Sequence, residues 1–172
     1  IGTNVLAARF FGAKDSGGMS RTVHTSMTVA IYGGIALMIA GLAVARPLLV
    51  LMDTPEEILP MSCTYIWICF CAIPFIMLYN FGCAILRAVG DTRRPLYFLI
   101  IAGIVNVLLN LFFVIVCGMD VGGVALATAI SHGISAFLIL KTLISARDVY
   151  RLQLKKLSVD FTIFKEMLKI GI

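Results

Sequence analysis

Charged residues are scarce in this sequence of 172 residues, at only 13%. A soluble domain has roughly a quarter of its residues charged. Hydrophobic residues make up 60% of the chain, and its mean hydropathy is +1.03. This combination excludes an ordinary soluble domain and indicates a polytopic membrane protein.

The sequence also lacks the patterns of an enzyme or a metalloprotein. It contains no GxSxG, HExxH or phosphate-binding loop, so we expect no catalytic residues. Its five cysteines lie in or beside apolar runs, at spacings that fit neither a zinc site nor a disulfide framework. We therefore expect no metal and no cofactor. The basic residues lie between apolar runs rather than in one patch, which argues against a nucleic-acid partner despite the net charge of +5.

Four apolar runs predict helices that cross the lipid bilayer, since a membrane helix needs about 20 mainly apolar residues. They cover residues 22–52, 58–86, 95–117 and 121–141. Residues 1–13 are too few to cross a bilayer, so we expect them to end an earlier helix. The first residue is not Met and no signal peptide is present, which favours a piece of a larger transporter. The predicted fold class is an all-α helical bundle.

The last segment, residues 145–172, is expected to lie outside these spans. Its first part is basic and predicts a cytoplasmic connector. Ser158 is the expected cap of an amphipathic helix in which Phe161, Phe164 and Leu168 share one side. We expect this helix to lie at the membrane surface and to lead into a further span.

The loops alternate in charge along the whole chain. Every second loop is basic, with Lys14 and Arg21, then Arg87, Arg93 and Arg94, then Lys141, Arg147, Arg151, Lys155 and Lys156. The other loops carry Asp53, Glu56, Glu57 and Asp120, with Arg46 as the one basic residue near them. By the positive-inside rule, the basic loops are expected in the cytoplasm of a multi-pass protein of the cell (plasma or inner) membrane.

Two amides lie deep in the third span and are the first candidates for a binding function. Asn106 and Asn110 are four residues apart, so they stack on one helix face. An asparagine offers a carbonyl oxygen to a cation and an NH2 group to a substrate. The alternative is an interhelical hydrogen bond, worth about 0.6 kcal/mol. Both interpretations stay open at this point.

Further polar residues lie on the neighbouring spans. On the fourth span, Thr128 is a candidate ligand, and His132 is either a proton relay or a hydrated structural histidine. On the second span, Pro74 predicts a helix kink. Asn80 either joins Asn106 in a site or satisfies the backbone freed at that kink. No complete span contains an acid at its middle, so a coupling carboxylate is expected outside this sequence.

Four motifs resemble the MATE family of multidrug and toxin extrusion transporters. Residues 86–95 (LRAVGDTRRP) resemble the loop between that family's fourth and fifth helices, and residues 12–15 (GAKD) resemble the loop after its second helix. Residues 106–110 (NVLLN) and 122–128 (GGVALAT) resemble its fifth and sixth helices. The four motifs follow the family order over nearly the whole chain.

This resemblance implies a cation-coupled antiporter of twelve helices in two lobes. Uptake of H+ or Na+ would drive export of small amphipathic, often cationic, compounds by alternating access. Residues 1–144 would be most of the N-terminal lobe, from the end of helix 2 through helix 6. Residues 145–172 would be the connector to helix 7. Helix 1 and the C-terminal lobe would lie outside this sequence.

The resemblance also implies a cation site in this lobe. In prokaryotic relatives an aspartate on helix 1 anchors it, and polar residues on helices 5 and 6 complete it. Asn106, Asn110 and Thr128 match those positions, and Asn80 is a weaker match on helix 4. Some relatives have an aspartate where this chain has Asn110. This departure disfavours the proton-linked site and leaves coupling from the other lobe, or a different ion.

Two other functions remain open. One is a lipid or polysaccharide-precursor flippase of the same superfamily, which would need basic residues inside its cavity to bind phosphate. The basic residues of this sequence lie in loops instead. The other is a structural membrane subunit without transport activity, which substrate-dependent efflux would distinguish from a pump.

Overall fold

The computed structural model describes residues 2–154 and 157–171, and within these ranges it contains helices and no strands. Four helices are long and apolar enough to cross a membrane. The expected all-α bundle is therefore confirmed. The elements are α1 (Gly2–Gly12), α2 (Ser16–Leu51), α3 (Leu59–Ala88), α4 (Arg93–Leu111), the π-helix η1 (Phe112–Val116), α5 (Val121–Ser145) and α6 (Phe161–Gly171).

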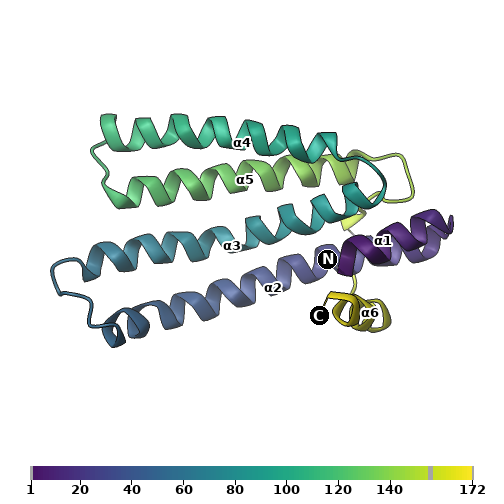
Figure 1. Cartoon of the computed structure of the whole chain (residues 1–172), viewed down its shortest axis with the longest axis horizontal. Helices are drawn as coiled ribbons and strands as arrows, with labels where there is room; N and C mark the ends of the chain where they lie inside the picture. Colours follow the sequence, from purple (N-terminus) through teal and green to yellow (C-terminus); the bar gives the residue numbers. More distant parts are fainter. Residues whose placement is uncertain (1, 155–156, 172) are drawn as a thin grey trace.

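The long helices stand in a row in the order α2, α3, α5, α4 (Figure 1). α3 packs against both α2 and α5, whereas α4 packs mainly on α5. Among the residues of α4, only Pro95 and Ala102 are buried, so the helix presents a long apolar surface. Such a surface is stable only in lipid or against further protein.

The main buried cluster gathers at one end of the row, where α1 and α6 lie beside α2 (Figure 1). We call this the basic end, because the loops rich in Lys and Arg meet there. Its fully buried side chains come from α1, α2, α3, α5 and the segment after α5: Ala7, Met19, Val23, Met27, Ile85, Leu86, Ile139, Leu143 and Leu152. The basic end is therefore the best-packed part of the chain.

α2 begins at Ser16, earlier than the expected start at residue 22. The carboxylate of Asp15 caps the helix by accepting a hydrogen bond from the backbone N–H of Gly18 at 2.9 Å. Gly18 does not break the helix, because its missing side chain makes room for the ring of Phe10 on α1. Gly18 therefore serves the close packing of α1 against α2.

The basic turn of residues 86–95 is held by its own hydrogen bonds. α3 ends at Ala88, and Gly90, two residues later, has a φ of +86° in the left-handed region. The N–H of Asp91 then returns to the carbonyl of Leu86 at 2.9 Å. The Asp91 carboxylate accepts the N–H of Arg94 at 3.2 Å and pairs with its guanidinium at 3.2 Å. These contacts give the motif a structural role in joining α3 to α4.

The cap and the buried face of α6 differ from the sequence prediction. Asp160, not Ser158, caps the helix, since its Oδ1 accepts the N–H groups of Thr162 and Ile163 at 2.9 and 3.3 Å. The buried side chains of the helix are Ile163 and Met167, whereas Phe161 and Leu168 are 73% and 46% exposed. The predicted apolar side is therefore only partly covered, with Phe164 and Leu168 lining a cavity beside α1, α2 and α3, whereas Ile163 and Met167 form the buried stripe.

The segment between α5 and α6 is tied to the start of α2. Three contacts make this connection: His24 Nε2 accepts the N–H of Gln153 at 3.1 Å, Thr25 Oγ1 accepts the N–H of Asp160 at 3.1 Å, and Arg21 pairs with Asp160 at 3.5 Å. A fourth contact holds α6 itself, because Ser26 Oγ donates to Met167 Sδ at 3.7 Å. His24 is fixed for this role, since its Nδ1 donates to the Ser20 carbonyl at 2.7 Å. We call Arg21, His24, Thr25 and Ser26 the connector clasp.

Asp160→Ala is expected to loosen α6. The substitution removes the helix cap and the pairing with Arg21, and loss of a cap costs about 1 kcal/mol. Limited proteolysis should then cut between Tyr150 and Phe161 faster than in the unchanged protein. Ser158→Ala is the matched control and should leave the cleavage rate unchanged. Faster cleavage in both variants would contradict the assignment of Asp160 as the cap.

Candidate cation and substrate site

A hydrogen-bonded network joins the last turns of α4 to the first half of α5. Asn106 Nδ2 donates to Thr128 Oγ1 and to Ser131 Oγ, both at 3.3 Å. Asn110 Nδ2 donates to Asn106 Oδ1 at 3.1 Å. The structure thus brings together three of the candidate residues predicted from sequence: Asn106 and Asn110, one helical turn apart on α4, and Thr128 on α5.

The two hydroxyl groups of the network donate their protons to backbone carbonyls of α5. Thr128 Oγ1 donates to the carbonyl of Val124 at 2.9 Å, and Ser131 Oγ donates to the carbonyl of Thr128 at 2.8 Å. Hydroxyls whose protons are committed to their own helix can only accept from Asn106. Asn106 must then accept from Asn110. The orientation of both amides follows from the hydroxyl groups on α5.

The network ends at an open acceptor. Asn110 Oδ1 is buried, and among the described residues it has no hydrogen-bond partner. A buried acceptor left unpaired costs about 1–3 kcal/mol, so such atoms usually contact a donor or an ion. The lone pairs of Asn110 Oδ1 are therefore free to accept a donor or an ion, and the binding role of Asn110 stays a prediction.

The chemistry of these groups fits a cation of low charge. Amide and hydroxyl oxygens are hard, neutral ligands that suit Na+ or a substrate ammonium group. The described residues contain no group of three or more His, Cys, Asp or Glu placed to hold a metal ion. One amide oxygen does not complete a cation site, so further oxygen ligands are needed beside Asn110.

Sequence reading missed two features of the site. Ser131 lies three residues after Thr128, and this helical spacing is the signal that would have found it. The second feature is η1, a π-helical turn that begins two residues after Asn110, with Cys117 N–H bonded to the Phe112 carbonyl at 3.1 Å. π-turns are frequent at functional sites, but no sequence pattern here predicts one.

The other candidates lie apart from this network. Asn80 is exposed on α3 and lines a separate cavity of about 290 Å³ bounded by α1, α2, α3 and α6. His132 is half-buried on α5, and the described residues include no hydrogen-bond partner for its ring. α3 runs as one helix through Pro74, where Gly34 of α2 approaches closely. The relay role of His132 and the kink at Pro74 stay predictions.

A family model and individual relatives of this chain indicate the same protein family. The MatE family model matches residues 1–112. Probable multidrug resistance protein YoeA of Bacillus subtilis is 31% identical over 182 residues, covering 99% of this chain and 38% of that protein. Multidrug export protein MepA of Staphylococcus aureus is 27% identical over 176 residues, covering 100% of this chain and 38% of that protein.

The chain is similar to solved structures of a multidrug resistance MATE family transporter in both its inward-facing and its outward-facing conformation. The inward-facing conformation of a multidrug resistance MATE family transporter of the MOP superfamily matches with a TM-score of 0.91, 27% identity, and coverage of 99% of this chain and 39% of that chain. The outward-facing conformation matches with a TM-score of 0.90, 27% identity, and coverage of 99% and 38%. The chain thus spans about 38% of the length of these relatives, which corresponds to one lobe. Since the family model covers more than half of the sequence, the chain belongs to the MATE family of membrane transporters, which are not enzymes.

Proposed function

We propose that this chain is the N-terminal lobe of a cation-coupled multidrug efflux antiporter. The buried, unpartnered Oδ1 of Asn110 is the observation that carries this proposal. A coupling cation, or the ammonium group of a substrate, would bind this oxygen together with ligands from outside the described residues. Helix 1 and the second lobe, as parts of a longer chain, would supply them.

Sodium suits this site better than a proton. Asn106, Asn110, Thr128 and Ser131 carry no group that titrates near neutral pH, so the network itself holds no exchangeable proton. A proton-coupled site here would need His132 or a carboxylate from elsewhere in the longer chain. Amide and hydroxyl oxygens bind Na+ directly.

Alternating access is the proposed mechanism, with the basic end in the cytoplasm. The nearly equal similarity to inward-facing and outward-facing relatives supports a lobe that keeps its internal structure while the two lobes rotate. Transporters built from two related halves place their binding sites between or within the moving units. The charge alternation of the loops supports the cytoplasmic side.

The test follows a cationic dye in pump-deficient cells that express the complete protein. A sodium gradient and a proton gradient are imposed separately, and dye efflux is measured under each. We expect efflux driven by sodium. Efflux driven by the proton gradient alone would keep the antiporter and reject sodium at this site. Absence of efflux under both gradients, with the protein present in the membrane, would favour a flippase or a structural subunit.

A further inference from the structure

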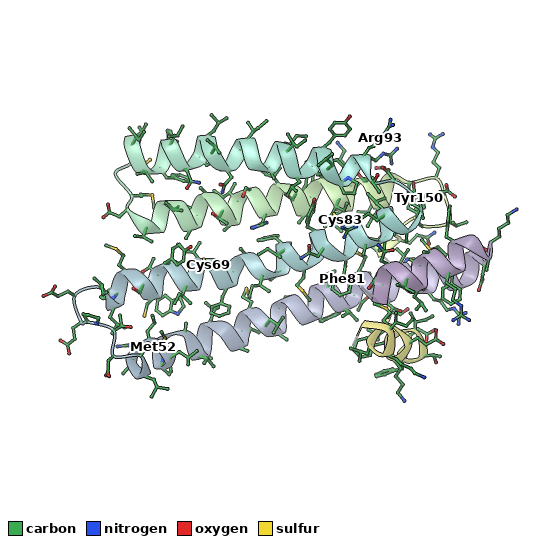
Figure 2. The ribbon with its side chains drawn as sticks, viewed as in Figure 1. Met52, Cys69, Phe81, Cys83, Arg93 and Tyr150 are labelled. Atoms are coloured by element: carbon green, nitrogen blue, oxygen red, sulfur yellow. The ribbon has the colours of Figure 1, made fainter. Side chains whose placement is uncertain are left out.

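An open cavity of about 710 Å³ lies at the basic end, away from the Asn110 site. It lies among the first turn of α4, the last turns of α5 and the segment after α5, and is lined by Arg94, Phe98, Leu138, Lys141, Arg147 and Tyr150, among others. Figure 2 shows this end of the bundle, with Arg93 at the start of α4 and Tyr150 beyond α5. A cavity of this size accommodates a small organic ligand.

Three basic side chains from three separate segments meet in this cavity. Arg94 belongs to α4, Lys141 to α5, and Arg147 to the segment that follows. Arg94 is partly neutralised, since Asp91 pairs with its Nε at 3.2 Å. Within residues 2–154 and 157–171, Lys141 and Arg147 form no salt bridge. The cavity therefore keeps positive charge available for an anion.

One acidic residue offsets part of this charge. Asp148 also lines the cavity, and its Oδ1 accepts the backbone N–H of Val149 at 2.9 Å. The hydroxyl groups of Thr142 and Ser145 add polar atoms to the wall. Against Asp148 and the Asp91 that pairs with Arg94, the three cations leave a net positive charge, which favours a ligand that carries a phosphate group.

The apolar wall indicates what the anion is attached to. Phe98 and Leu138 line the cavity beside its basic groups. Ile101 of α4 and Phe137 of α5, 45% and 64% exposed, lie about one helical turn from Phe98 and Lys141, toward the middle of the two helices. A soluble anion gains nothing from these side chains, whereas the acyl chains of a lipid would cover them.

We propose that this cavity binds the phosphodiester headgroup of an anionic phospholipid. Lys141 and Arg147 contact the phosphate, with Arg94 beside them, and the acyl chains lie along Ile101 and Phe137. The site lies where a headgroup belongs, at the end of helices that are long enough to cross the bilayer. Basic pockets between membrane helices are a known way to hold such headgroups.

The test uses the complete purified protein in a neutral detergent. Short-chain phosphatidylglycerol is added in increasing amounts, and bound lipid is counted by native mass spectrometry. The double variant Lys141→Gln/Arg147→Gln should bind it about 30-fold more weakly, since each basic residue near a membrane surface contributes a factor of about five. Phosphatidylcholine with the same acyl chains should bind far more weakly than phosphatidylglycerol to the unchanged protein.

The control Lys14→Gln/Lys165→Gln removes the same charge at the same end, outside the cavity. It should retain the affinity of the unchanged protein for phosphatidylglycerol. Equal weakening by both double variants would show diffuse attraction and overturn the site. Unchanged binding in the cavity variant, or equal binding of the two lipids, would also overturn it. Displacement by inorganic phosphate at comparable concentrations would assign the cavity to a soluble anion instead.

Discussion

Asn110→Leu is expected to abolish most cation-driven transport while leaving the protein folded. The substitution removes the buried acceptor and also the N–H that orients Asn106. A hydrogen bond to a charged partner contributes about 1.5–3 kcal/mol, so the apparent affinity for the coupling cation should fall about 10- to 100-fold. The measurement is the sodium concentration that gives half-maximal dye efflux from vesicles containing the complete protein.

Two variants make this result specific. Leu108→Ala alters a side chain of α4 that is 60% exposed, and it should leave the sodium dependence unchanged. Asn110→Asp keeps the oxygen at the same position and adds a charge that titrates. It should retain cation binding and make that binding pH-dependent, strongest at high pH. If Asn110→Leu keeps the sodium dependence of the unchanged protein, the amide is only a structural contact between α4 and α5.

Gly34→Ala is expected to destabilise the pairing of α2 with α3. A Cβ atom at this position would lie 2.8 Å from the Cα of Pro74, which is closer than such atoms approach in folded proteins. A backbone atom cannot rotate away, so the two helices must separate. Overpacking of this kind costs about 1–3 kcal/mol. The thermal unfolding temperature of the purified protein in detergent should fall accordingly.

Gly33→Ala is the matched control, because it makes the same chemical change one residue earlier. The nearest atom to a Cβ at Gly33 is the flexible Cε of Met77, at 3.8 Å. The gain in helix propensity is the same in both variants, so their difference isolates the contact with Pro74. Equal unfolding temperatures for the two variants would mean that α2 and α3 tolerate the extra methyl group.

The spans were predictable because membrane helices depend on length and apolarity alone. The pairing of Asn106 with Asn110 was predictable too, since four residues make one helical turn. Sequence reading placed the cap of α6 at Ser158 because serine is a common cap residue. Asp160 takes that role because α2 supplies partners for it, Arg21 for its carboxylate and Thr25 for its N–H. Such a tertiary contact leaves no local signal in the sequence.

The roles of Gly18 and Gly34 also depend on tertiary contacts that the local sequence does not reveal. The role of a glycine in an apolar helix depends on which group of a neighbouring helix packs against it. The ring of Phe10 occupies the space at Gly18, and the backbone at Pro74 occupies the space at Gly34. The open acceptor of Asn110 was equally hidden, because it depends on which way the hydroxyls of α5 donate.

The connector clasp bears on the conformational entropy of the segment after α5 during the proposed rotation of the lobe. A slack linker between two bodies changes its conformational entropy as they separate, and this opposes or assists the motion. Here the backbone N–H groups of Gln153 and Asp160 are already held by His24 and Thr25. Rotation of the lobe would carry these residues along without changing their freedom. If the lobe rotates as proposed, Gln153 and Asp160 would therefore move with it as part of one rigid body, at no cost in conformational entropy.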